Sequence, residues 1–258
     1  VFMDSEVWVN GESVGRQPYG YSSFQFDLTP HMKSGSNVLA VRVNVQQPCS
    51  RWYSGAGIYR HVRLTITEPV HVAHWGTYVT TPEVADSAAK VRIRTCVQND
   101  GKGGVKASLT TCILDQAGKK VGEQKSDAQI AGGGTNEFDQ AIKVEAPVRW
   151  TLDNPHLYRA VSEVRVGDKL VDGYETSFGI RTIEFTADNG FLLNGKRVQV
   201  KGVCMHHDLG CLGSAVNRRA IERQIEILKD MGCNAIRTSH NPPAPEVLDV
   251  CDRMGILV

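Results

Sequence analysis

Asn234-Ala235-Ile236-Arg237-Thr238-Ser239-His240-Asn241-Pro242-Pro243 is the stretch that decides the fold of this chain. Residues 234–238 are predicted as a short apolar strand, and polar side chains follow it up to the two prolines. Arg237, Ser239 and His240 therefore stand at the end of a strand. In folds built from parallel β/α units, functional groups gather at the carboxyl ends of the strands.

A helix is predicted on each side of this strand. The earlier helix covers about residues 218–231, with Asn217 as a favourable N-cap and Gly232 as a stop signal. Its apolar residues fall on one stripe, at Ile221, Ile225 and Leu228. The later helix opens at Pro245, a residue favoured at the first helical position, and Gly255 ends it.

Two further strands frame these helices. The turn signal Asn194-Gly195 predicts a hairpin whose second arm, residues 197–200, continues into Lys201-Gly202-Val203 as a buried strand. Residues 256–258 begin a third strand after the second helix. The order strand, helix, strand, helix, strand indicates parallel β/α units.

Residues 1–74 are predicted to be β structure. Asn10-Gly11 lies between Val7-Trp8-Val9 and Val14, and this dipeptide favours the positive φ angles of a tight hairpin turn. Apolar and polar residues also alternate with the period of a half-buried strand at 24–28, 41–45 and 62–66.

Residues 75–182 show shorter strands separated by glycine-containing turns. The alternation is clear at 91–94, 107–110 and 161–166. Many short strands at this length predict a sandwich of the seven-stranded type. Gly132-Gly133-Gly134 is not followed by Lys and Ser or Thr, so a phosphate-binding loop is not expected here.

The bulk composition excludes several classes of protein. A chain of 258 residues with 41% apolar residues can bury a sizeable core, and its formal net charge is only +1. We therefore expect neither a nucleic-acid partner nor a membrane partner. The seven cysteines are odd in number and form no C-x-x-C pair, so neither a disulfide framework nor a zinc cluster is expected.

Two clusters of polar residues carry the chemistry. The first strand is followed by His206, His207 and Asp208, and the second ends in Arg237, Ser239, His240 and Asn241. If the two strands are neighbours, these side chains line one mouth, with donors suited to sugar hydroxyls or to a carboxylate. Purely structural histidines are the alternative interpretation. A zinc site is disfavoured, because adjacent histidines rarely share one metal.

A glycine-containing loop rich in aromatic residues is the second candidate for a functional role. The segment Arg51-Trp52-Tyr53-Ser54-Gly55-Ala56-Gly57-Ile58-Tyr59 could stack its rings on a sugar, or the rings could pack between domains. Both interpretations stay open at this point. Trp150 with Asn154-Pro155-His156-Leu157-Tyr158 is predicted to be a structural corner of the sandwich.

These segments resemble motifs of glycoside hydrolase family 2. The similar segments are 51–60 at the end of the sugar-binding jelly roll, 150–158 in the immunoglobulin-like domain, and 194–206 and 234–243 in the first two barrel strands. The resemblance implies a multidomain, mostly β chain: part of a jelly-roll sandwich at 1–74, an immunoglobulin-like sandwich at 75–182, and the truncated start of a TIM barrel at 183–258.

The resemblance also implies a function. Enzymes of this family are retaining exo-glycosidases that use two glutamates, and residues 18–29 resemble β-galactosidases most. His206 and His240 match positions that bind sugar hydroxyls, and Arg237 matches the arginine that orients the nucleophile. The expected partner is a β-galactoside. The alternatives are a β-glucuronidase, a β-mannosidase or a non-catalytic carbohydrate-binding module.

The chain also departs from the family pattern, and each departure leads to an expectation. No catalytic residue is expected in this chain, because the two glutamates belong to later strands and Glu222, Glu226 and Glu246 fall on helices. We expect no turnover by the chain alone, and a need for a homo-oligomer or the missing barrel half. No metal ligand or cofactor is predicted here, and a Mg or Na ion is compatible with the complete enzyme only.

The first residues, Val1-Phe2-Met3-Asp4, look like the interior of a longer protein. Any signal region would therefore lie outside this chain, and the sequence fits a periplasmic or a cytoplasmic protein equally. In β-galactosidases an aspartate near position 51 can reach the sugar. Residues 46–51 contain no acid, so this contact is not expected.

Overall fold

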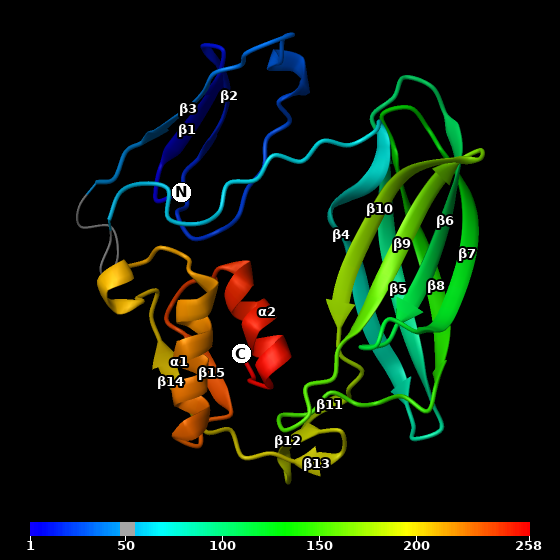
Figure 1. Ribbon diagram of the computed structural model, residues 1–258, viewed down its shortest axis with the longest axis vertical. Helices are drawn as coiled ribbons and strands as arrows, with labels where there is room; N and C mark the ends of the chain where they lie inside the picture. Colours follow the sequence, from blue (N-terminus) through cyan, green and yellow to red (C-terminus); the bar gives the residue numbers. More distant parts are fainter. Residues whose placement is uncertain (47–54) are drawn as a thin grey trace. The chain divides into compact units, whose positions relative to one another are not determined.

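The computed structural model describes residues 1–46 and 55–258 (Figure 1). The chain divides into two compact units. The first contains residues 1–63, 201–251 and 256–258, and the second contains residues 64–200 and 252–255. No helix among the described residues is long and apolar enough to cross a membrane.

The first unit begins with a small antiparallel sheet. Its strand order is β2-β1-β3, from β1 (Ser5–Val9), β2 (Glu12–Gln17) and β3 (Leu39–Val43). Asn10 and Gly11 turn the chain between β1 and β2 with φ angles of 53° and 89°, which confirms the predicted tight turn. A short 3-10 helix, η1 (Thr29–His31), follows.

The first unit also contains the β/α segment. The strands β14 (Gly202–Met205) and β15 (Ala235–Thr238) pair in parallel, with the 3-10 helix η2 (Gly210–Leu212) and the helix α1 (Arg218–Asp230) between them. The helix α2 (Pro245–Met254) follows β15, and its residues 252–254 are counted with the second unit. Asn217 caps α1 as predicted, because its side chain accepts a hydrogen bond from the Ala220 amide.

The second unit is a β-sandwich followed by a small hairpin sheet. One sandwich sheet has the order β4-β5-β8 and the other β10-β9-β6-β7. The sandwich strands are β4 (Val70–Val84), β5 (Ala88–Asn99), β6 (Val105–Leu114), β7 (Lys120–Ile130), β8 (Thr135–Glu145), β9 (Tyr158–Val166) and β10 (Lys169–Phe178). The hairpin sheet contains β11 (Ile183–Thr186), β12 (Gly190–Leu193) and β13 (Lys196–Arg197).

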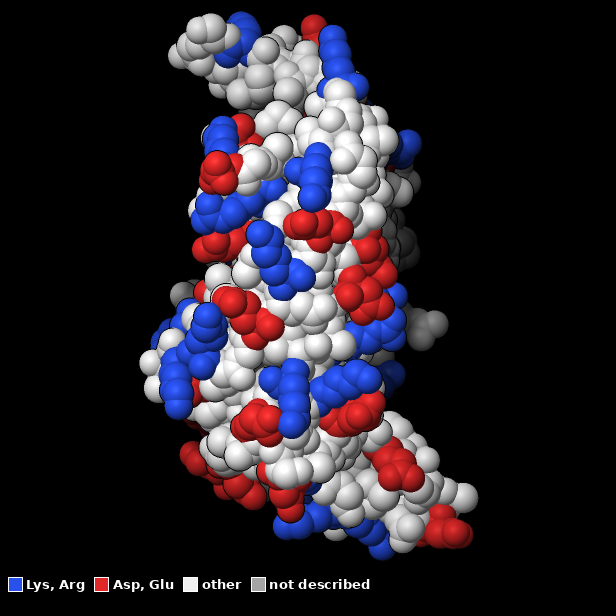
Figure 2. Space-filling model, turned by 90° about the vertical axis from the view of Figure 1, so that its right-hand side faces the viewer, with Lys and Arg blue, Asp and Glu red and all other residues white. Residues whose placement is uncertain are grey.

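Alternating side chains of both sandwich sheets form the core. Val91, Ile93, Leu109, Ile113 and Val164 are fully buried, and each lies one position away from an exposed or half-buried neighbour on its strand. On the face drawn in Figure 2, acidic and basic side chains interleave without a patch of one sign. Ion pairs also link neighbouring strands within each sandwich sheet, such as Arg92 with Asp139 and Arg159 with Glu175.

Three sequence predictions need correction. Residues 24–28 and 62–66 are not strands, and Ile66 is 86% exposed. Alternation alone does not make a strand, since each strand also needs a neighbour for its backbone hydrogen bonds. The second arm of the hairpin at Asn194-Gly195 ends at Arg197. The strand β14 is separate from it, and β14 is not fully buried because one of its faces is open.

Candidate functional site

Parallel pairing of β14 and β15 brings the two predicted clusters together. In this register Cys204 lies opposite Arg237 and Met205 opposite Thr238. The ladder continues one step further, because the Ser239 amide donates to the Met205 carbonyl at 2.9 Å. Both strands therefore end at the same edge, and the residues that follow them enter one site.

His206 and His240 meet at this edge. Their ring centroids are 5.7 Å apart and the ring planes are nearly perpendicular, at 89°. Two imidazoles at this spacing can donate to neighbouring hydroxyls of one small ligand. The structure thus places the two predicted sugar-binding histidines side by side, at the ends of different strands.

Arg237 fixes the protonation pattern of the His240 ring. Its Nη1 lies 3.2 Å from His240 Nδ1. A guanidinium can only donate, so Nδ1 must accept and the ring proton must sit on Nε2. His240 therefore presents an N–H donor on the side away from Arg237.

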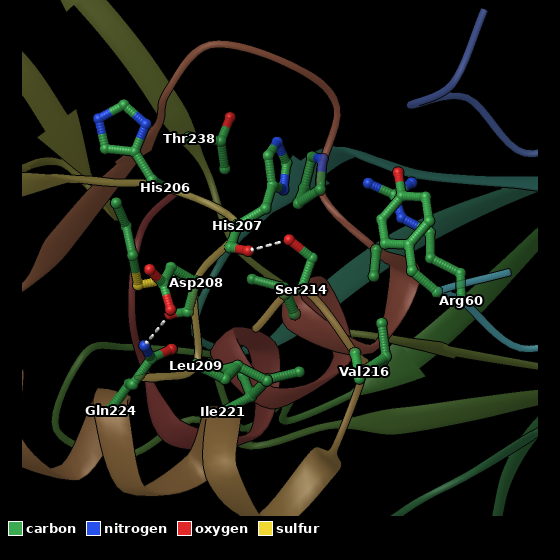
Figure 3. Close-up of a pocket in the computed structure, with 16 residues that line it drawn as sticks. Arg60, His206, His207, Asp208, Leu209, Ser214, Val216, Ile221, Gln224 and Thr238 are labelled. Carbon is green, nitrogen blue, oxygen red and sulfur yellow. Dashed lines mark hydrogen bonds between the residues drawn. The ribbon is translucent and has the colours of Figure 1, made fainter. Parts of the chain in front are cut away.

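His207 faces the opposite side of the strand end from His206 (Figure 3). Its ring stacks on Tyr21, with centroids 5.0 Å apart. Burial lowers the pKa of His207, and the nearby charge of Arg60 adds to this effect. His207 is therefore neutral near pH 7 and packs as an aromatic ring, which is the structural interpretation left open by the sequence.

Residues near position 20 and residue 60 brace the loop that carries His240. The Arg60 guanidinium donates to the carbonyls of Tyr21 at 2.7 Å and Pro242 at 2.8 Å. The Tyr19 hydroxyl donates to the side chain of Asn241 at 2.8 Å. Burial raises the pKa of Tyr59 to about 12, and its hydroxyl donates to the Gly20 carbonyl at 2.7 Å.

These bracing contacts were not assigned from the sequence. Residues 18–21 and Arg60 lay inside segments noted only for their resemblance to the family, and nothing local linked them to His240. The aromatic rings at Trp52 and Tyr53 belong to residues 47–54, outside the described residues. Stacking on a sugar and packing between domains therefore both stay predictions for these rings.

The cavity beside His206 and His207 is too small for a sugar. It has a volume of about 50 Å³ and lies against α1 and α2, with Ile221, Gln224 and Val247 in its walls (Figure 3). This volume holds only a few water molecules. Arg237 and His240 do not line this cavity, and both are exposed.

Glu246 anchors the chain near residue 63 to the first turn of α2. Its carboxylate accepts a hydrogen bond from Arg63 at 2.8 Å, and His61 Nδ1 lies 2.8 Å from the same oxygen. Burial alone would raise the pKa of Glu246. The hydrogen bond from Arg63 and the surrounding positive charges outweigh burial, so the pKa is lowered.

Glu246→Gln should make the unfolding free energy less dependent on pH in the acid range. A carboxylate with a lowered folded pKa stabilises the fold above its unfolded pKa of 4.5, and this contribution disappears as pH falls through the folded pKa. We expect a loss of about 1 kcal/mol at pH 7 that vanishes near pH 3. Urea titrations at both pH values measure it.

Glu226→Gln is the matched control for Glu246→Gln. Glu226 pairs with Arg219 on the exposed face of α1, at 2.7 Å and 2.8 Å. Exposed pairs of this kind contribute roughly 0–0.5 kcal/mol. An equal loss in the two variants at pH 7 would contradict the role given to Glu246.

The two glutamates of α1 are also engaged in ion pairs. Glu222 lies 3.5 Å from Arg219 on α1, and Glu226 pairs with the same arginine. Within residues 1–46 and 55–258, no group of three His, Cys, Asp or Glu side chains is arranged to hold a metal ion.

Two family descriptions match adjoining parts of the chain. "Glycosyl hydrolases family 2" matches residues 70–181, and "Glycosyl hydrolases family 2, TIM barrel domain" matches residues 184–258. Together they cover the sandwich and the β/α segment, in the order expected from the sequence.

Similar proteins and structures cover the whole chain. A β-galactosidase of Bacteroides ovatus, BoGH2A, is 51% identical over all of this chain and 31% of its own length. A putative β-glucuronidase of Formosa agariphila is 36% identical, over all of this chain and 24% of its own length. The crystal structure of a family 2 member from Bacteroides cellulosilyticus superposes with a TM-score of 0.97 at 42% identity, over all of this chain and 36% of that one. The chain thus spans about a quarter to a third of the length of these relatives.

Proposed function

Because the chain belongs to glycosyl hydrolase family 2, we propose that it is the part of a retaining β-galactosidase that supplies sugar-binding groups to the active site. The observation that carries the proposal is the convergence of His206 and His240, with centroids 5.7 Å apart, beside Arg237. The identity of 51% to a β-galactosidase supports the choice of sugar.

The geometry suits recognition of a neutral sugar. His240 directs an Nε2–H donor outward, because Arg237 occupies its Nδ1. His206 provides a second ring at right angles to it. Two directional groups on different strands can bind two hydroxyls of one ring and so define its orientation.

Arg237 is given a different role from the histidines. A guanidinium binds carboxylates through paired N–H groups, and this holds the carboxylate in a defined orientation. In the proposed reaction one glutamate attacks the anomeric carbon and another protonates the leaving group, with both glutamates outside this chain. Arg237 would then orient the nucleophilic glutamate.

A β-glucuronidase is the second candidate, since one relative carries that description at 36% identity. A glucuronide differs from a galactoside by a carboxylate at C6, which requires a positively charged partner. Among the described residues of the site, Arg60 is engaged with the carbonyls of Tyr21 and Pro242, and the proposal commits Arg237 to the nucleophile. This leaves the neutral galactoside as the better fit.

A panel of nitrophenyl glycosides on the full-length protein tests the choice of substrate. We expect kcat/KM to be highest for the β-galactoside, ahead of the β-glucuronide and the β-mannoside. His206→Ala and His240→Ala should each lower kcat/KM for the galactoside about 10- to 100-fold, the loss typical when a bound polar group is left unpaired.

His74→Ala is the control for the two histidine variants. His74 is exposed on the sandwich and stacks on Trp75, so its replacement should leave kcat/KM unchanged. A higher kcat/KM for the glucuronide would reject the galactosidase proposal in favour of the second candidate. Full activity in both site variants would reject the assignment of the site.

A further inference from the structure

Within the described residues, a single nitrogen, Nη1, makes all the hydrogen bonds of the Arg237 guanidinium. Nη1 lies 3.1 Å from Ser239 Oγ, 3.2 Å from His240 Nδ1 and 3.6 Å from Cys204 Sγ. The side chain is thus held from one end. Nε and Nη2 are left to meet a ligand or a carboxylate.

Cys204 reaches this nitrogen because of the strand register. It lies directly opposite Arg237 in the parallel pairing of β14 and β15, and both residues are exposed on the open face of the sheet. Side chains at paired positions of neighbouring strands project to the same face. The contact is therefore built into the backbone and does not depend on a flexible loop.

The surroundings of Cys204 polarise its thiol. The Ser239 hydroxyl first, and then the Arg237 guanidinium, lower the pKa of Cys204 by hydrogen bonding to its sulfur. Ser239 is itself only 1% exposed, so its hydroxyl is fixed between the arginine and the cysteine. A lowered pKa favours the thiolate, which is a stronger acceptor for a guanidinium than the neutral thiol.

We propose that Cys204 is a positioning residue for Arg237, which it anchors together with Ser239 so that the free side of the guanidinium faces the nucleophilic glutamate. This inference rests on the proposed function. The inference goes beyond the proposed function because it names the group that orients the arginine. It also implies that enlarging the Cys204 side chain displaces Arg237 and lowers activity.

Substitutions in the full-length protein test the anchoring role. Cys204→Ala should lower kcat for a β-galactoside about tenfold while KM changes less than about twofold, because the arginine is mispositioned for the transition state. Cys204→Ser keeps a small acceptor and should restore most of kcat. An unchanged kcat in Cys204→Ala, with the protein folded, would overturn the proposal.

A reversible modification gives an independent readout. Methyl methanethiosulfonate should inactivate the wild type: the Cys204 thiolate attacks its sulfur, a methyl disulfide forms on Cys204, and methanesulfinate leaves. Dithiothreitol, a dithiol reductant, should release methanethiol and restore activity. Cys211→Ser, which removes another exposed thiol, should be inactivated like the wild type, whereas Cys204→Ser should resist. Equal inactivation of Cys204→Ser would count against the inference.

The contact itself can be measured without any turnover. The rate at which iodoacetamide alkylates Cys204, followed by peptide mass spectrometry across pH, reports the pKa of its thiol. Arg237→Gln should raise this pKa, because the positive charge beside the sulfur is lost. An unchanged pKa would contradict the anchoring contact, whereas absence of galactosidase activity alone would reject only the proposed function.

Discussion

Arg237→Ala in the full-length protein should slow hydrolysis of a β-galactoside by about two to three orders of magnitude, the effect expected when a preorganised donor at the reacting centre is removed. The guanidinium touches three groups of the site, Ser239, His240 and Cys204, at 3.1 Å, 3.2 Å and 3.6 Å. Its loss removes the proposed partner of the nucleophile and releases the His240 ring. Steady-state kinetics with a nitrophenyl β-galactoside give kcat and kcat/KM.

The conservative variant separates charge from geometry. Arg237→Lys keeps the positive charge but loses the planar fork, so most of the rate should still be lost. Arg219→Ala is the control. It removes an equal charge from an exposed residue of α1 that pairs with Glu226, and it should keep full activity. A rate within threefold of wild type for Arg237→Ala would disprove the assigned role.

Trp150→Ala should destabilise the sandwich unit by about 3–5 kcal/mol, the usual cost of removing a large buried aromatic side chain. Trp150 is 1% exposed and its indole lies beneath the Arg181 guanidinium, 4.6 Å from the ring centroid. Its Nε1 donates to the Asp252 carbonyl at 2.8 Å. The substitution therefore leaves a cavity and removes the hydrogen bond to the Asp252 carbonyl.

Urea denaturation followed by far-ultraviolet circular dichroism measures this loss. Trp150→Phe keeps a ring but removes the N–H donor, so it should cost less than the alanine variant, about 1–3 kcal/mol. Trp75→Ala is the matched control, since Trp75 is 61% exposed and should cost less than about 1 kcal/mol. Equal midpoints for Trp150→Ala and Trp75→Ala would refute the prediction.

Local signals predicted many of the elements correctly. Asn10-Gly11 and Asn194-Gly195 both turn the chain with positive φ angles, and Asn217 caps α1. Each of these signals acts over a few residues, so the chemistry of the residues themselves is sufficient. The same holds for Pro245, which begins α2 where it was predicted to.

Alternation of apolar and polar residues predicted strands less well where the segment has no neighbouring strand to pair with. Residues 41–45 overlap β3, which pairs with β1, whereas residues 62–66 have the same pattern and form no strand. A strand is stabilised by the backbone groups of another strand, and that partner is not encoded in its own pattern. The alternation at 62–66 therefore predicted a tendency and not a structure.

The sequence by itself determined the family, the order of the elements and the positions of His206, Arg237 and His240 at two strand ends. Only the tertiary structure decided that Cys204 faces Arg237, that His207 stacks on Tyr21 and that Arg60 braces the loop after His240. Turns and caps depend on neighbours within a few residues, so they can be predicted locally. Contacts across parallel strands depend on how two segments far apart in the sequence are brought into register, which the pattern of one strand alone does not specify.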